Sequence, residues 1–206
     1  MDREIQAYFA KLGELGSRLE AGGRDGTSLT LSGAVEWTIQ RLNEIRARDA
    51  KVMFVGNGGS AAIASHMAID YSKNGGFSAL AFNDGAALTC LANDLGYDQV
   101  FAEQVEQHGR SGDLLIAISS SGNSANIVNA AVAARARDIA VLTLSGFEPD
   151  NRLRGLGDIN IYAPSGLYGF VEIAHLTFCH AILDIVMGWR AEGGRPVYAE
   201  VRRNRA

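Results

Sequence analysis

The sequence predicts an α/β fold built on a doubly wound, five-stranded parallel sheet that follows an N-terminal helical extension. From Lys51 onward, short apolar runs alternate with longer segments whose apolar residues recur at helical spacing. The apolar runs show little alternation of apolar and polar residues, which is typical of strands covered on both faces. The length of 206 residues suits one such domain with a helical extension.

Two amphipathic helices are expected at the start of the chain, over residues 2–21 and 33–48. We expect residues 1–50 to form the interface of a homotetramer, because two such helices would leave apolar faces exposed on a monomer. The sheet domain is expected over 51–190, and a basic tail over 191–206. The expected strands cover 51–56, 77–82, 113–119, 139–145 and 158–163, and the expected helices after them cover 60–73, 97–109, 123–137, 150–156 and 168–190.

Composition excludes several classes of protein. The net charge of −4 argues against nucleic acid as a partner, because binding to phosphate backbones needs a basic surface. Cys90 and Cys179 are far apart in apolar surroundings and are expected to be reduced core thiols. The charged N-terminus does not resemble a signal peptide, and the longest uncharged run, 114–134, is too rich in Ser and Asn to span a membrane. A soluble, cytoplasmic protein is expected.

The first strand runs into a glycine loop, GNGGS at 56–60, where a helix is expected to begin. Glycines let the backbone approach an anion closely, so that N–H groups at the helix N-terminus can point at it. The loop has neither the dinucleotide-binding pattern of glycines nor the lysine of a nucleotide-binding phosphate loop. Taken alone, it can equally be a simple strand-to-helix turn.

The third strand ends in a serine loop, SSSGNS at 119–124, which also precedes a helix. Its hydroxyl groups and the helix N-terminus can together hold a phosphate without a lysine or arginine, through charge-assisted hydrogen bonds and the helix dipole. Ser124 can also be a simple N-cap. Three adjacent serines exceed what a cap needs, so the loop predicts a phosphate site.

A third polar segment, Ala92 to Gly96, follows the second strand and is interpreted as a loop. Its Asn93 and Asp94 can shape a turn, or they can contact hydroxyl groups of a ligand bound beside it. His108 lies in a polar segment and is expected to be exposed.

Three of the four histidines share two expected helices with carboxylates. His66 and Asp70 are four residues apart and lie on one helix face. On the last long helix, Glu172 and His180 are separated by about two turns, with His175 between them. Such a set can hold a divalent metal ion or transfer protons. His66 alone can be an ordinary surface histidine.

These motifs together resemble the sugar isomerase (SIS) domain family, specifically its phosphoheptose isomerase branch. The resemblance covers about residues 1–190 and implies a flavodoxin-like sheet. It is carried by GNGGS at 56–60, His66, CLANDLGYDQVFAEQV at 90–105, GDLLIAISSSGNSANIV at 112–128, and the E-x-x-H-x-x-x-x-H run at 172–180.

The resemblance implies that the substrate is a sugar phosphate and that its phosphate lies in the serine loop. It assigns the sugar to the glycine loop and its hydroxyl groups to the third segment. The residues implied to bind the substrate are Asn57, Gly58, Gly59, Ser60, Asn93, Asp94, Ser119, Ser120, Ser121 and Ser124.

The resemblance also implies a divalent metal ion, Zn²⁺, bound by four residues. Two of them differ from the family's ligands, because Asp70 stands for a Glu and Glu172 for a Gln. The site would therefore carry one more formal negative charge than the family's. Asn74 and Gly169 stand where the family has an arginine and an acidic residue. The implied metal ligands are His66, Asp70, Glu172 and His180.

The implied reaction is an aldose–ketose isomerisation through an enediol(ate), with sedoheptulose 7-phosphate converted to glycero-manno-heptose 7-phosphate. Asp70 or Glu172 would be the base, and His180 the acid or a metal ligand. Two alternatives stay open: an isomerase of a different sugar phosphate, and a non-catalytic binding or regulatory protein of the type that associates with a replication initiator. The acid at position 70 favours an enzyme.

Overall fold

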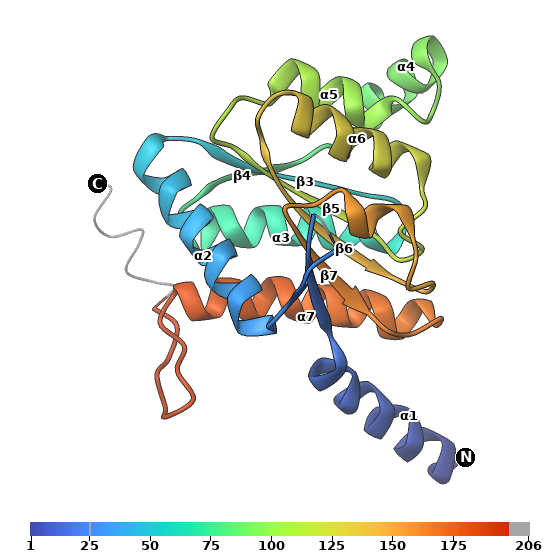
Figure 1. Cartoon of the computed structure of the whole chain (residues 1–206), viewed down its shortest axis with the longest axis vertical. Coiled ribbons are helices and arrows are strands. Elements are labelled where there is room, and N and C mark those ends of the chain that lie inside the picture. The colour runs from blue at the N-terminus through green and yellow to red at the C-terminus, as the bar shows by residue number, and fades with distance from the viewer. Residues whose placement is uncertain (25, 198–206) are drawn as a thin grey trace.

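The computed structural model describes residues 1–24 and 26–197, and it contains a sheet with helices on both faces (Figure 1). The sheet order is β2-β1-β7-β6-β5-β3-β4. Its last five strands are parallel, which confirms the predicted parallel sheet. The parallel strands are β3 (Lys51–Gly56), β4 (Ser78–Ala81), β5 (Leu114–Ser119), β6 (Ala140–Gly146) and β7 (Ile159–Ala163).

Two hydrophobic layers enclose the parallel strands, because successive strand residues face opposite sides of a sheet. Met53 and Phe54 are neighbours in β3, and both are fully buried in different layers. One layer packs against α2 (Leu31–Arg48), α3 (Gly59–Lys73) and α7 (Tyr168–Val186). The other packs against α5 (Val100–His108) and α6 (Ala125–Ala136).

After the neighbouring strands β3 and β5, the chain continues towards opposite side edges of the sheet. From β3 it passes through α3 to β4, and from β5 it passes through α6 to β6. Because α3 and α6 each follow the carboxyl end of one of these parallel strands, their N-termini lie at the same edge of the sheet, on its two faces. Parallel α/β sheets bind ligands at such a point.

The prediction for the first 30 residues is partly wrong. The first helix, α1 (Asp2–Leu15), ends six residues early and is followed by the short 3₁₀ helix η1 (Gly16–Arg18). The chain then forms an antiparallel hairpin from β1 (Glu20–Gly23) and β2 (Ser28–Leu29). β1 extends the sheet by pairing with β7, where it buries Ala21 and Gly23. Backbone pairing with an existing edge strand outweighs the weak helical pattern of this segment.

The two N-terminal helices differ in their surroundings. The second helix is confirmed as α2, and it packs on the sheet with Ala34, Leu42 and Ile45 buried. In contrast, α1 projects from the sheet domain (Figure 1) and buries only Leu15. Of its apolar side chains, Phe9 is 64% exposed. The expected exposure of apolar surface therefore applies to α1 and not to α2.

The segment after the second strand forms a helix, so its interpretation as a loop is wrong. This helix, α4 (Gly85–Leu95), begins at Asp84, whose carboxylate accepts a hydrogen bond from the N–H of Ala87. The expectation of two core thiols is half correct, because Cys179 is buried and Cys90 is exposed on α4. The short helix near 150–156 is confirmed as the 3₁₀ helix η2 (Arg152–Gly155).

The helix α7 is the only one in the described part of the chain that is long and apolar enough to span a membrane by length and composition. Its apolar side chains, including Phe178 and Ile182, are buried against the rest of the protein. We therefore interpret α7 as a core helix. The expected basic tail lies mostly at 198–206, outside the described residues.

His175 belongs to this core and not to a surface site. Its ring is fully buried, and its Nε2 lies 3.0 Å from the carbonyl oxygen of Ser145 in β6. Because a carbonyl only accepts, Nε2 must be the donor of this hydrogen bond and carries a proton. Burial lowers the pKa of His175 from 6.5 to about 4, although the hydrogen bond to Ser145 opposes this shift.

This pKa predicts a loss of stability in acid. Between about pH 6.5 and pH 4 the unfolded chain binds a proton at His175 that the folded protein does not, so the free energy of unfolding falls as the pH falls. Urea unfolding at pH 7 and pH 5 should show about 2 kcal/mol of this loss from His175. His175→Gln should remove that component, whereas the exposed His108→Gln should keep the wild-type slope. Equal slopes for wild type and His175→Gln would contradict the assignment.

Candidate active site

A cavity of about 240 Å³ lies at the carboxyl ends of β3 and β5. Both predicted loops contribute to it, together with the first turns of α7. Of the residues predicted to bind a substrate, only Asn93 and Asp94 do not line it. The lining residues are Asn57, Gly58, Gly59, Ser60, Ile118, Ser119, Ser120, Ser121, Ser124, Tyr168 and Glu172.

The glycine loop turns sharply into α3. Gly58 has φ +54° and occupies the N-cap of this helix. Gly59 lies directly against Glu172, because a Cβ atom on it would be 2.3 Å from the carboxylate Oε1 of that residue. A larger residue at position 59 would therefore displace the carboxylate of Glu172 from its present place against the N-terminus of α3.

The serine loop is held in shape by its own hydrogen bonds. The N–H of Gly122 donates to Ser119 Oγ at 3.1 Å, and the hydroxyl of Ser119 donates to Ser124 Oγ at 3.3 Å. Ser124 occupies the N-cap of α6, as expected for a cap, but its side chain makes no capping bond. Among the described residues, the buried hydroxyl of Ser120 has no hydrogen-bond partner. Buried hydroxyl groups without partners are rare, so this one is suited to a ligand in the cavity.

No lysine or arginine side chain lines this cavity in the described part of the chain. Its positive potential comes from the N-termini of α3 and α6, where backbone N–H groups have no partner within their helices. An anion bound here would accept hydrogen bonds from these N–H groups and from the serine hydroxyls. Glu172 is the one carboxylate among the lining residues, and it sits on the α7 side of the cavity.

The third predicted segment lies apart from this cavity. Asn93 and Asp94 are exposed in the last turn of α4, where the amide of Asn93 donates to the carboxylate of Asp94 at 2.7 Å. Neither residue lines the cavity within one chain. In contrast, Tyr168 lines it and was not predicted, because a tyrosine at the start of a helix carries no distinctive sequence signal.

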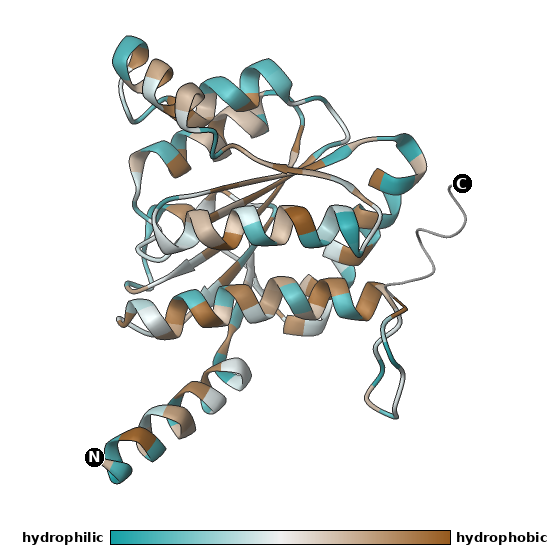
Figure 2. Ribbon diagram, turned by 180° about the vertical axis from the view of Figure 1, so that it is seen from behind, coloured by the Kyte–Doolittle hydropathy of each residue, from teal (hydrophilic) through white to brown (hydrophobic). Residues whose placement is uncertain are grey.

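A second group of functional side chains joins α3 to α7, which lie side by side (Figure 2). His66 Nε2 is 3.3 Å from His180 Nε2 and 3.6 Å from the Oδ2 atom of Asp70. One ligand atom from each of the three lies within 4.8 Å of the others. Asn74 lies beside Asp70. Its amide donates to Asp70 Oδ1 at 3.2 Å, which leaves Oδ2 facing the imidazoles.

The three side chains fit a divalent metal ion. Zinc bonds of about 2.0–2.2 Å place neighbouring ligand atoms of a tetrahedral site about 3.3–3.6 Å apart. The distances from His66 Nε2 to His180 Nε2 and to Asp70 Oδ2 fall in this range, and the third, from Asp70 Oδ2 to Nδ1 of His180, is longer at 3.9 Å. Two imidazoles and a carboxylate are also a usual set of zinc ligands, and three protein ligands leave one position open for a substrate.

Glu172, the fourth predicted ligand, is not in this group. It lies on the same side of α7 as His180, as the spacing of eight residues predicts. However, eight residues correspond to about 12 Å along a helix axis, which puts Glu172 in the cavity of the serine loop. The helical spacing predicted the shared face, and three of the four ligands that the resemblance implies lie together in this chain.

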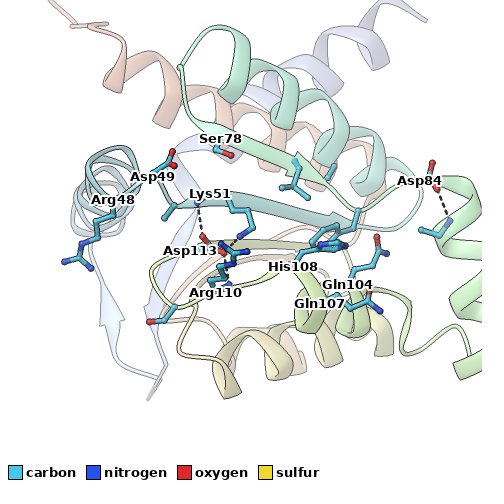
Figure 3. Close-up of a pocket in the computed structure, with 16 residues that line it drawn as sticks. Arg48, Asp49, Lys51, Ser78, Asp84, Gln104, Gln107, His108, Arg110 and Asp113 are labelled. Carbon is cyan, nitrogen blue, oxygen red and sulfur yellow. Dashed lines mark hydrogen bonds and ion pairs between the residues drawn. The ribbon is translucent and has the colours of Figure 1, made fainter.

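A larger cavity of about 760 Å³ lies at the other end of the sheet, near the amino ends of β3 and β5 (Figure 3). The carboxylate of Asp113 there accepts hydrogen bonds from the backbone N–H and the ammonium of Lys51 and from the N–H of Arg110. His108 is exposed at its rim, as predicted, and stacks beside Phe82. The glycine loop, the serine loop and Glu172 all line the smaller cavity and none of them lines this one, so we place the function at the smaller one.

Comparison with known proteins agrees with this geometry. The chain matches the SIS domain family over residues 27–146. Phosphoheptose isomerases from Edwardsiella ictaluri and Chlorobium phaeovibrioides are 38% and 41% identical to it, over 74% and 66% of this chain and 82% and 68% of theirs. The structure of the phosphoheptose isomerase from Neisseria gonorrhoeae has a TM-score of 0.78 and 31% identity, covering 90% of this chain and 98% of that one.

These relatives confirm the predicted fold and the predicted class of enzyme. The protein is an isomerase of sugar phosphates. The chain belongs to the SIS domain family, in its phosphoheptose isomerase branch.

Proposed function

We propose that the protein interconverts sedoheptulose 7-phosphate and glycero-manno-heptose 7-phosphate in a metal-assisted site. The observation that carries this proposal is the arrangement of two functional groups along the paired helices α3 and α7. The cavity with the serine loop lies at the N-terminal ends of these helices. The group of His66, Asp70 and His180 lies farther along both.

The separation of the two groups suits a long sugar. His180 lies eight residues beyond Glu172, which is about 12 Å along α7. In an extended seven-carbon ketose phosphate, the carbonyl carbon lies about 9 Å from the phosphorus, given bonds of about 1.5 Å. A sugar with its phosphate in the cavity would thus extend towards Asp70 and His180, whereas a triose phosphate would reach less than half of that distance.

We assign the base to Asp70, because it lies beside the candidate acid. Asp70 would take a proton from C1 of the ketose while His180 donates one to the oxygen on C2, which gives the enediol. Return of a proton to C2 and loss of the proton on the C1 oxygen then gives the aldose. Glu172, the other candidate base, would instead accept hydrogen bonds from sugar hydroxyl groups beside the phosphate.

The proposed cofactor is a divalent metal ion, Zn²⁺, held by His66, Asp70 and His180. When bound, it would supply electrophilic stabilisation of the negative charge that develops on the substrate oxygens. Asn74 supports this arrangement, because its hydrogen bond to Oδ1 of Asp70 directs Oδ2 towards both imidazoles.

We also propose a homotetrameric, cytoplasmic enzyme in which residues 1–50 form part of the interface. The support is the exposed apolar surface of α1, where Ile5 and Phe9 are 51% and 64% exposed. Asn93 and Asp94 are also exposed on one chain. The proposed contact of these two residues with sugar hydroxyls would be made where subunits meet.

The direct test is incubation of the purified protein with sedoheptulose 7-phosphate, with and without a chelator. We expect formation of the aldose phosphate and its loss after chelation. Turnover of another sugar phosphate, with none of the heptose phosphate, would overturn the substrate assignment. Turnover that continues after complete removal of metal would overturn the proposed role of the metal ion.

Three substitutions test the assigned roles. Asp70→Asn and His180→Ala should each lower kcat by about a hundredfold or more, because they remove the proposed base and acid. Glu172→Gln should keep the metal content and most of the activity, because Glu172 lies outside the metal group. Metal analysis, kcat and the thermal midpoint should be measured for all three. Normal turnover by Asp70→Asn would show that the base has been assigned to the wrong residue.

The serine loop is tested by the double substitution Ser119→Ala and Ser121→Ala. It should weaken binding of a sugar phosphate by about 2 kcal/mol, roughly a thirtyfold rise in KM, because two hydroxyl donors to an anion are lost. Ser111→Ala, an exposed serine outside the cavity, should leave KM unchanged. If the double variant binds as the wild type does, the serines only shape the loop.

The oligomer is tested by light scattering at micromolar concentration. The chain mass is 21.9 kDa, and a tetramer should show about four times this value. Replacing Ile5 and Phe9 with Lys should shift the protein to smaller species, since it puts charge on an apolar contact surface. A wild-type mass of 21.9 kDa would refute the assembly.

A further inference from the structure

The side chain of Asn57 in the glycine loop is held by two other segments. Its amide donates to Asn126 Oδ1 at 2.8 Å, and its own Oδ1 accepts from the amide of Asn126 at 3.0 Å. The same Oδ1 accepts a hydrogen bond from the hydroxyl of Tyr97 at 3.0 Å. Both lone pairs of this oxygen are therefore used within the protein, and one amide hydrogen of Asn57 remains for a ligand.

These three residues come from three different parts of the site. Asn57 belongs to the glycine loop, while Asn126 lies in the first turn of α6, directly after the serine loop, and is buried. Tyr97 lies in the connection from α4 to α5, two residues after the end of α4. A second bond fixes this connection, because the amide of Asn129 in α6 donates to the carbonyl of Asp98 at 2.9 Å.

The paired amides join the two loops that would hold the phosphate. Such a pair has no freedom of rotation, because each amide is donor and acceptor to the other. Tyr97 adds a donor to one end of the pair from a segment that is otherwise outside the cavity. Tyr97 is 59% exposed, so loss of its hydroxyl should have little effect on the hydrophobic core.

We propose that Tyr97 is a positioning residue of the phosphate site, which acts through Asn57 to fix the glycine loop relative to the serine loop. The proposal rests on the proposed function, since it takes the cavity to be the phosphate site. An anion held by N–H and hydroxyl groups, without any basic side chain, depends on the simultaneous alignment of all its donors. Loss of the Tyr97 hydroxyl should therefore loosen phosphate binding and leave the distant acid–base pair intact.

The test is Tyr97→Phe, which removes one oxygen atom and keeps the ring. We expect KM for sedoheptulose 7-phosphate and Kd for inorganic phosphate to rise by about five- to tenfold, as for the loss of one hydrogen bond. The kcat should change by less than about twofold, and the thermal midpoint should stay within about 2 °C. In an Asn57→Ala background, Tyr97→Phe should add no further effect, because the hydroxyl acts through Asn57.

The matched control is Thr89→Val in the preceding helix, whose hydroxyl donates only to backbone carbonyls of α4. It should leave KM, Kd and kcat unchanged. A Tyr97→Phe protein with unaltered KM and Kd would overturn the proposal, as would a fall in kcat alone or a lowered thermal midpoint with unchanged KM.

Inorganic phosphate separates this proposal from the proposed enzyme activity. If the wild type binds phosphate but does not isomerise the heptose phosphate, the proposed substrate fails and Kd still tests Tyr97. A wild type that binds neither compound would overturn both.

Discussion

The site depends on the point in the sheet where the order of the strands reverses, between the neighbouring parallel strands β3 and β5. Because these parallel strands lead into α3 and α6 on opposite faces, the N-termini of both helices lie at one edge of the sheet. Hydrophobic burial holds both helices there: Met67 of α3 packs in one layer and Ile127 of α6 in the other. Burial in the core thus positions the two helix N-termini, and hydrogen bonds within the site hold the loops that precede them.

This origin explains how an anion site can lack basic side chains. Backbone N–H groups at the start of a helix are fixed by the helix behind them, so they lose little conformational freedom when a ligand binds. A lysine in the same place would lose about 2 kcal/mol of rotamer entropy. The serine hydroxyls complete the donor set, and the buried Ser120 is the member with no protein partner among the described residues. Because these donors are neutral, the net charge of the occupied cavity would come from the substrate and from Glu172.

The strands, the meeting of the glycine loop and the serine loop at one cavity, and the pairing of His66 with Asp70 could be predicted from the sequence, because each depends on local patterns or on the topology of a parallel sheet. The hairpin at 20–29 could not, since its only signal is the pairing of β1 with β7 across more than a hundred residues of chain. The helix α4 was missed because Asn93 and Asp94 favour turns. Glu172 was grouped with His66, Asp70 and His180 because the resemblance implied it, and the helical spacing gives a shared face but no distance between them. The bonds of Tyr97 likewise need the folded arrangement of three segments.

The helix α7 bears the half-buried Glu172 and His180 within about a quarter turn of each other, next to the buried His175 and Cys179. These roles are tied to a rotational phase, because each residue of an α-helix advances by about 100°. Insertion or deletion of one residue between 172 and 180 would turn His180 away from His66, or else expose the core side and bury a charge. A substitution in this segment alters one position, whereas a change in its length displaces every later side chain of α7 relative to both the core and the group on α3. Insertions and deletions between 172 and 180 should therefore damage packing and the site together.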